Sequence, residues 1–109
     1  MIYIIADDLT GATDTGVQFS KQGYNTHVVI VSESEPPALT ESFQRNGHID
    51  VLVLDTETRE ADAATARNRI KQILQEITPY DDDVVYKKVD STLRGNIGVE
   101  LDECMRILK

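Results

Sequence analysis

Residues 2–8 read Ile-Tyr-Ile-Ile-Ala-Asp-Asp, and this stretch decides the fold class because a largely apolar run ends abruptly in two carboxylates. Continuous apolar runs of this length are typical of strands that are buried on both faces of a parallel sheet. The same kind of run recurs at residues 27–31 and 51–54. We therefore expect three buried strands at these positions.

A fourth strand is expected at residues 84–89, which are less apolar than the other three runs. Alternation along this strand gives two faces, with Val85, Lys87 and Val89 on one and Tyr86, Lys88 and Asp90 on the other. At least one of these faces should meet polar groups.

Helical patterns lie between the strands. The first covers residues 13–22, ends at Gly23 and has Val17 and Phe19 as its main apolar residues. The second covers residues 61–77, and its apolar face consists of Ile70, Ile73, Leu74 and Ile77. A last helix carries an apolar stripe made of Ile97, Leu101, Cys104, Met105 and Leu108. Residues 36–45 are ambiguous, because paired prolines are compatible with a short helix or an extended segment.

Strands that alternate with helices predict the α/β class, with a parallel sheet in a three-layer, Rossmann-like domain over residues 1–109. In such sheets, ligands bind beyond the carboxyl ends of the strands. Three polar segments fall there, at residues 7–14, 55–59 and 90–98. The sequence therefore predicts one binding site, built by these three segments, at this edge of the sheet.

Composition limits the kind of ligand. The net charge of −8 would repel a polyanion over most of the surface, so nucleic-acid binding is disfavoured. A small anion is still compatible, because a few nearby Lys and Arg side chains outweigh diffuse charge that is screened over about 8–10 Å. Cys104 is the single cysteine, which is typical of a reducing compartment, and we expect it to pack rather than to react. With no apolar membrane span and no basic leader, we expect a soluble, cytoplasmic protein.

Residues 87–98 read Lys-Lys-Val-Asp-Ser-Thr-Leu-Arg-Gly-Asn-Ile-Gly and combine cations, an anion and hydroxyls at a strand-to-helix turn. Such a mixture is poor material for a core, because charged side chains are rarely buried without partners. Lys87, Lys88 and Arg94, together with the amides that begin the last helix, favour the binding of a small anion. Turn and capping chemistry is the alternative for Ser91 and the other short polar residues here.

The other two segments also have a functional and a structural interpretation. Asp7 and Asp8 can bind a cation, accept hydrogen bonds from substrate hydroxyls or act as a general base; alternatively, one caps a helix and the other is solvated. Arg59 can hold a carboxylate through two parallel hydrogen bonds, with Asp55 or Thr56 contacting hydroxyls. Its structural interpretation is a solvated arginine beside a helix start.

Two further patterns are set aside. Gly11 and Gly16 have the spacing of a phosphate loop, but Val17 and Gln18 occupy the positions of its Lys and Ser or Thr. These glycines are expected to permit a tight turn and close helix packing instead. The two histidines lack partners at metal-ligand spacing, so we expect them to be structural and expect no metal site.

Three blocks together make the chain resemble the N-terminal, sugar-binding domain of the four-carbon acid sugar kinases. They are residues 5–14 (Ile-Ala-Asp-Asp-Leu-Thr-Gly-Ala-Thr-Asp), 55–59 (Asp-Thr-Glu-Thr-Arg) and 87–100. The second departs from the family at Thr58, where a serine is more usual. The resemblance spans this whole chain but only the first part of a family member, so it implies that a C-terminal nucleotide-binding domain is absent here.

The resemblance implies that the complete enzyme phosphorylates a terminal hydroxyl of a four-carbon sugar acid, such as threonate, erythronate or an oxo-tetronate. ATP and Mg2+ would serve the complete enzyme, and this part alone is expected to bind neither and to be inactive. Asp8 or Asp7 is the candidate base. The substrate-binding candidates are Asp8, Arg59, Lys87, Lys88, Asp90, Ser91, Thr92 and Arg94. The expected partners are the small acidic substrate and the missing domain; a homo-oligomer, the stereoisomer and the identity of the base are left open.

Two rival functions remain. A phosphoacceptor receiver domain also places an acidic pair after its first strand, an Asp after its third and a late Lys, which Asp55 and Lys87 imitate. It leaves residues 90–98 without a role. A non-catalytic module that senses a small acid is the other rival, and tight tetronate binding by this chain alone would favour it.

Overall fold

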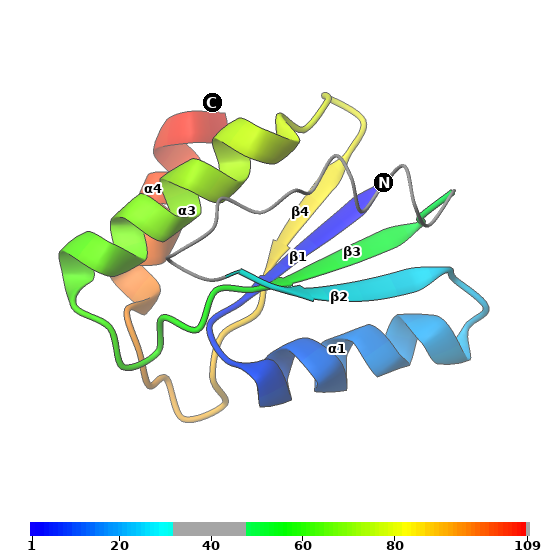
Figure 1. Ribbon diagram of the computed structural model, residues 1–109, viewed down its shortest axis with the longest axis horizontal. Helices are drawn as coiled ribbons and strands as arrows, with labels where there is room; N and C mark the ends of the chain where they lie inside the picture. Colours follow the sequence, from blue (N-terminus) through cyan, green and yellow to red (C-terminus); the bar gives the residue numbers. More distant parts are fainter. Residues whose placement is uncertain (32–47, 109) are drawn as a thin grey trace.

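The computed structural model describes residues 1–31 and 48–108 as a parallel sheet between two layers of helices (Figure 1). The strands β1 (Ile2–Ala6), β2 (Thr26–Ile30), β3 (Val51–Asp55) and β4 (Val84–Lys87) lie in the order β2-β3-β1-β4. Helix α1 (Leu9–Lys21) covers one face, whereas α3 (Ala63–Ile77) and α4 (Ile97–Leu108) lie on the other. The predicted α/β class and three-layer arrangement are confirmed. The ambiguous segment at residues 36–45 lies outside the described residues.

The two central strands carry the core. Every residue of β3 is buried, and β1 pairs with it in register from Ile2 opposite Val51 to Ala6 opposite Asp55. Alternate residues of the two strands serve two separate clusters. One packs Ile5, Leu52 and Leu54 against the predicted apolar face of α3, and the other packs Ile4, Val51 and Val53 against α1. Each fully buried aliphatic side chain contributes about 1.5–3 kcal/mol. A shift of one residue would move these side chains to the opposite face, so their burial fixes the register of β1 and β3.

Strand β2 corrects the expectation that all apolar runs are buried on both faces. It begins one residue earlier than predicted and lies at the edge of the sheet, where Val28 is 39% and Ile30 is 55% exposed. Its composition is that of a buried strand, but at the edge of the sheet part of it is not covered by the described residues. Strand β4 is the other edge and ends at Lys87, two residues before the predicted end.

Helix α1 begins at Leu9, four residues before the predicted start, because Asp8 caps it by accepting a hydrogen bond from the Gly11 amide. The buried residues of α1 are Ala12 and Gly16, whereas Val17, which was expected to pack, is 44% exposed. A Cβ at Gly16 would lie 3.3 Å from Val53 Cγ2, so the helix approaches the sheet through small residues. The expected role of glycine in close helix packing is thus confirmed at Gly16.

Helix α4 shows the largest departure from its predicted face. Leu101, Met105 and Leu108 are exposed, whereas Glu100 and Glu103 are buried beside Cys104. The two carboxylates can be buried because Lys87 pairs with Glu100 and Arg67 and Arg106 pair with Glu103. Cys104 packs as predicted, and burial raises the pKa of its thiol to about 11.

The connections place a switch point between the two central strands. The chain leaves β1 toward α1 on one face, and it leaves the adjacent β3 toward α3 on the other (Figure 1). In doubly wound sheets, ligands bind where neighbouring loops diverge in this way. The strand order also excludes the receiver alternative, whose order of 2-1-3-4-5 places β1 rather than β3 beside β2.

Replacing Gly16 by Leu should lower the free energy of unfolding by about 1–3 kcal/mol, because the new side chain must displace Val53 and Val28. The exposed neighbour Val17 offers the matched control, and Val17→Leu should change this free energy by less than about 0.5 kcal/mol. Urea unfolding followed by circular dichroism measures both. Equal stabilities for the two variants would show that α1 is not held at this close distance.

Candidate functional site

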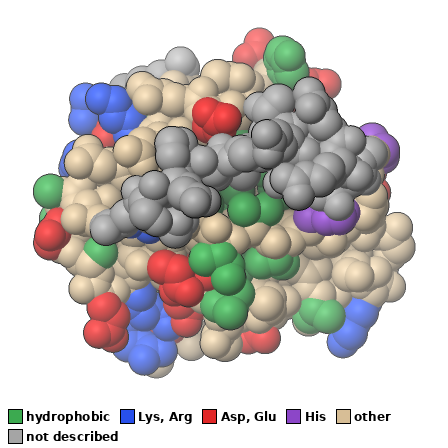
Figure 2. Space-filling model, in the orientation of Figure 1, with side chains coloured by type: hydrophobic (Ala, Val, Ile, Leu, Met, Phe, Trp, Pro, Cys, Tyr) green, Lys and Arg blue, Asp and Glu red, His purple; other side chains and the backbone are tan. Residues whose placement is uncertain are grey.

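A hollow of about 430 Å3 opens at the carboxyl edge of the sheet, at the switch point. It is lined by Asp8, Thr10, Gly11, Asp14, Arg59, Lys88, Asp90, Ser91 and Arg94. Figure 2 shows acidic and basic side chains side by side at the lower left of the molecule, where Figure 1 places the loop before α4 and the start of α1. The three polar segments of the sequence therefore meet at one place.

Arg59 lies at the centre of this charged cluster. Its guanidinium donates to Asp8 Oδ2 and Asp7 Oδ1, each at 3.0 Å, and lies 3.4 Å from Asp90 Oδ1. Burial lowers the pKa of Arg59, but the hydrogen bond to Asp7 and the charges of all three carboxylates outweigh burial, so this pKa lies above its usual value. The guanidinium therefore stays charged and links the loop after β1 to the turn before α4.

The acidic pair divides into one buried and one accessible carboxylate. Asp7 is only 3% exposed and its side chain pairs with Arg59, while its carbonyl accepts hydrogen bonds from the Thr58 and Arg59 amides. Asp8 caps α1 and binds Arg59, yet it lines the hollow. The alternative that one aspartate caps a helix is therefore right for Asp8. The other aspartate, Asp7, is not solvated, because Arg59 binds it.

Asp90 organises the turn that leads into α4. Its carboxylate accepts hydrogen bonds from the Thr92 amide and hydroxyl, the Arg94 amide and the Arg94 guanidinium, which binds both oxygens at 2.9 Å. The hydrogen bonds from Arg94, followed by those from Thr92, hold the pKa of Asp90 far below its usual value. Arg94 itself is two-thirds exposed, with a side-chain exposure of 66%.

Gly95 completes this turn in a conformation that only glycine adopts easily. Its φ is +99°, and a Cβ at this position would collide with Asp7 Oδ2 and come within 3.5 Å of the Arg59 backbone. The turn therefore folds directly over the Asp7 and Arg59 pair.

The two lysines of the predicted cluster point to different places. Lys88 lines the hollow, and its Cγ lies beside Gly11. Lys87 does not line it: its ammonium lies 3.3 Å from Glu100 Oε1 on the α4 side of the sheet, and its side chain is only 7% exposed. The alternation predicted for this strand therefore holds, and it separates the two cations.

The remaining predicted residues are placed as follows. Ser91 lines the hollow, whereas Thr92 turns its hydroxyl to Asp90 and is not among the lining residues. Thr10 and Asp14 also line the hollow; they lie within the predicted segment 7–14, but neither was among the individual candidate residues. Their spacing of four residues places them on one face of a helix that starts at Leu9, and the late predicted start of α1 concealed this.

Asp55 lies at the end of β3 and is fully buried. Its Oδ1 accepts the Glu57 amide at 3.0 Å, but its Oδ2 has no hydrogen-bond partner among the described residues. Burial raises the pKa of Asp55 to about 6, although the hydrogen bond from the Glu57 amide opposes this. A carboxylate in such a place cannot receive a phosphoryl group from solvent, which argues further against a receiver domain.

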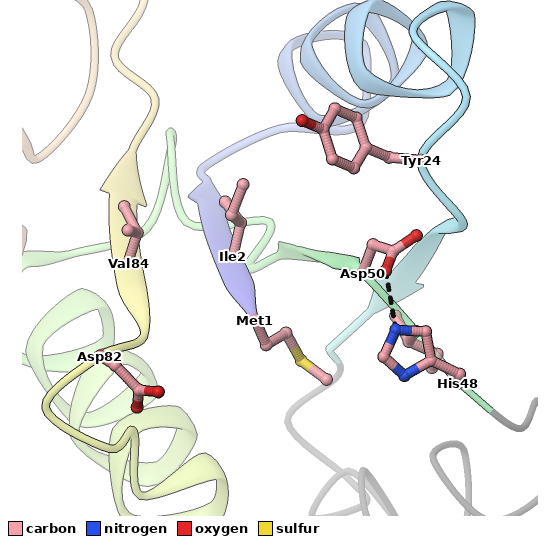
Figure 3. Close-up of a pocket in the computed structure, with 8 residues that line it drawn as sticks. Met1, Ile2, Tyr24, His48, Asp50, Asp82 and Val84 are labelled. Carbon is pink, nitrogen blue, oxygen red and sulfur yellow. Dashed lines mark hydrogen bonds and ion pairs between the residues drawn. The ribbon is translucent and has the colours of Figure 1, made fainter.

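A larger hollow of about 580 Å3 lies at the opposite, amino end of the strands (Figure 3). It is lined mainly by apolar groups, including Met1, Ile2 and Val84. Two of its polar side chains pair with each other, since His48 Nε2 lies 2.8 Å from Asp50 Oδ1, and Tyr24 and Asp82 also border it. This hollow lacks the convergent polar groups of the carboxyl edge, so we assign the site to the smaller one.

Other kinds of site find no support within residues 1–31 and 48–108. No group of three or more His, Cys, Asp or Glu side chains there is arranged to hold a metal ion. His27 contacts Asn25, and His48 contacts Asp50. None of the described helices is long and apolar enough to cross a membrane.

Comparison with known proteins gives consistent relatives. A family described as "Sugar-binding N-terminal domain" matches residues 2–109. The chain is 41% identical to a D-threonate kinase of Salmonella typhimurium over 94% of its own length and 22% of that protein. It is 32% identical to a D-erythronate kinase of Heliobacterium modesticaldum over 98% of its own length and 23% of that protein. The chain therefore spans less than a quarter of these curated relatives.

A solved structure agrees with the fold. It is a crystal structure of a domain of unknown function from Bordetella bronchiseptica, with bound citrate, as a domain-swapped dimer. The TM-score is 0.80 at 36% identity, and the match covers 97% of this chain and 25% of that one.

Asp55→Asn should increase the free energy of unfolding at pH 7.5 by on the order of 1–2 kcal/mol. The folded pKa of about 6 exceeds the unfolded value of 3.8, so the folded state binds more protons between these values, and stability falls as pH rises through about 6. Asn keeps the acceptor for Glu57 and removes the charge. Urea titrations at pH 5 and pH 7.5 measure the free energy of unfolding. Its change between the two pH values should be smaller for the variant than for the wild type, and an equal change would contradict this.

Proposed function

Since the chain belongs to the four-carbon acid sugar kinase family, as its sugar-binding N-terminal domain, we propose that it holds a four-carbon sugar acid for phosphorylation by ATP. In this proposal, the complete enzyme is longer than the chain and a second, C-terminal domain supplies the nucleotide site. The names of the relatives support threonate or erythronate as the substrate class. The citrate of the related crystal structure is likewise a hydroxylated acid.

The observation that carries the proposal is the mixed charge of the hollow. Three carboxylates line it, from Asp8, Asp14 and Asp90, and three cations line it, from Arg59, Lys88 and Arg94. A purely basic hollow would suit a phosphate, and a purely acidic one would suit a cation. A sugar acid needs both signs, because its hydroxyls donate to carboxylates and its own carboxylate accepts from cations. The volume is within the usual range for small-molecule sites, about 300–1,000 Å3.

We assign the substrate carboxylate to Lys88 and Arg94. Arg94 is exposed along most of its side chain and can exchange part of its contact with Asp90 for a ligand. Arg59 already serves three carboxylates, so its role is to fix Asp8 and Asp90 rather than to hold the substrate alone. Lys87 is assigned no contact with the substrate, because it pairs with Glu100 away from the hollow.

We assign the substrate hydroxyls to Asp8, Asp14 and Ser91, which border the hollow around the start of α1 and the turn before α4. Asp90 and Thr92 bind each other and shape that turn. Thr92 therefore acts on the substrate through Asp90 and Arg94.

Asp8 is the candidate base. In the transfer, the substrate hydroxyl oxygen attacks the γ-phosphorus of ATP, the bond from that phosphorus to the bridging oxygen breaks, and ADP leaves with the bond electrons. The hydroxyl proton passes to Asp8, whose carboxylate borders the hollow. Asp7 is unsuited to this step because it is buried beneath the turn at Gly95. Mg2+ would neutralise phosphate charge when ATP is bound, and we assign it no residue of this chain.

Arg94→Gln should weaken D-threonate binding to this chain about tenfold, because a charge-assisted contact with a carboxylate is lost. Arg106 provides the matched control: it is 64% exposed, pairs with a carboxylate on its own helix and lies away from the hollow. Arg106→Gln should leave the affinity within about twofold. Chemical-shift titration with D-threonate and D-erythronate measures the affinities.

Equal affinities for the two arginine variants would remove Arg94 from the site. Binding of the wild-type chain as tight as micromolar would favour the non-catalytic sensor, because the proposal expects a second, C-terminal domain to complete the site.

Asp8→Asn in the complete kinase should lower kcat by at least about 100-fold, which is the usual size of a general-base contribution. Asn still caps α1, so the helix start is preserved. Asp14→Asn is the comparison, because it replaces a charged acceptor for a substrate hydroxyl by a neutral, weaker one and should raise KM for the tetronate more than it lowers kcat. Steady-state assays of ADP release measure both constants. An unchanged kcat for Asp8→Asn would leave the base unidentified and would count against this mechanism.

A further inference from the structure

A chain of buried polar groups lies on the α4 side of the sheet, outside the hollow. Thr56, Thr58 and Glu100 are fully buried. The Thr58 hydroxyl donates to Glu100 Oε2 at 2.9 Å and lies 2.6 Å from the Thr56 hydroxyl. The Lys87 ammonium lies 3.3 Å from the other oxygen of Glu100. None of these residues lines the hollow, so the proposed function uses none of them directly.

Stability alone is a poor reason for this arrangement. Taking two charges out of water costs several kcal/mol for each ion, and apolar residues of similar volume often stabilise a fold equally well. A buried pair is better justified where it fixes one arrangement among several. Here the polar groups join three segments that are far apart in sequence: β4 through Lys87, α4 through Glu100 and the loop after β3 through Thr58.

That loop leads directly to the central cation of the site. The Thr58 amide donates to Asp7 O at 3.0 Å, and the Thr58 carbonyl accepts from Asn96 Nδ2 at 3.0 Å. The preceding residue, Glu57, has φ +51°, a left-handed conformation that costs a non-glycine residue energy and needs contacts to hold it. Arg59 follows immediately, so the path of the backbone at Thr58 decides where the guanidinium lies.

We propose that Glu100 is a positioning residue for the site. Glu100 accepts the hydrogen bond of the Thr58 hydroxyl and thereby places Arg59, and through Arg59 it sets the separation of Asp8 and Asp90 in the hollow. The consequence for tetronate binding rests on the proposed function. The placement of Arg59 does not, so the two can be tested separately.

Thr58→Val removes the hydroxyl and keeps the shape of the side chain, whereas Thr58→Ser keeps the hydroxyl. The first variant should shift the Arg59 Nε–Hε cross-peak in a 1H–15N spectrum and weaken D-threonate binding about tenfold. The second should leave the cross-peak in place and the affinity within about twofold. The Arg59 cross-peak is assigned by its loss in Arg59→Lys.

A pair of double variants separates positioning from stability. Lys87→Met with Glu100→Leu removes both charges together, so no unpaired charge stays buried and the domain should still unfold cooperatively in urea. It nevertheless removes the acceptor for Thr58, so the Arg59 cross-peak should shift and the affinity should fall about tenfold. Lys87→Met with Glu100→Gln keeps an acceptor oxygen for Thr58, so its cross-peak and its affinity should match those of the wild type. Both double variants lack Lys87, so they differ only at residue 100.

The double variant with Glu100→Leu could fold and still show an unmoved Arg59 cross-peak and an affinity within twofold of the wild type. That result would overturn the positioning role of Glu100. If the wild-type chain binds no D-threonate, the proposed substrate fails in this assay. The cross-peak comparison then still decides whether Glu100 positions Arg59.

Discussion

The Arg59 guanidinium holds together the edge of the sheet on which the hollow depends. Asp7, Asp8 and Asp90 converge on it in a chain whose net charge is already −8. In general, two carboxylates about 4 Å apart repel each other by about 4 kcal/mol at an effective dielectric constant of 20. One cation between them turns this repulsion into attraction. It also joins the loop after β1 to the turn before α4, so the same contact that balances charge fixes the shape of the hollow.

The parts of the fold that sequence predicted are those whose burial is decided locally. Continuous apolar runs gave β1 and β3, and a helical period gave α3, because these elements are buried along a whole face. Strand β2 has the same kind of sequence, but its place at the edge is a property of the whole sheet. The face of α4 could not be predicted, because the cation that allows Glu100 to be buried comes from β4.

The site was predictable at the level of segments but not of atoms. The rule that ligands bind at the carboxyl ends of parallel strands brings residues 7–14, 55–59 and 90–98 together, and they do meet at one hollow. Which aspartate is accessible depends on Arg59, 52 positions away from Asp7. Alternation separated Lys87 from Lys88 correctly, yet nothing in the sequence said which face the hollow occupies.

Gly95 shows how this site limits sequence variation. It lies at the surface, where most positions tolerate many residues, yet any side chain there meets both the left-handed backbone and the Asp7 carboxylate. An exposed position thus behaves like a core position. In a mutational scan, a prediction based on solvent exposure alone would overestimate how well Gly95 tolerates substitution. The constraint at Gly95 comes from the backbone and from Asp7 beneath it, not from the polar residues that border the hollow.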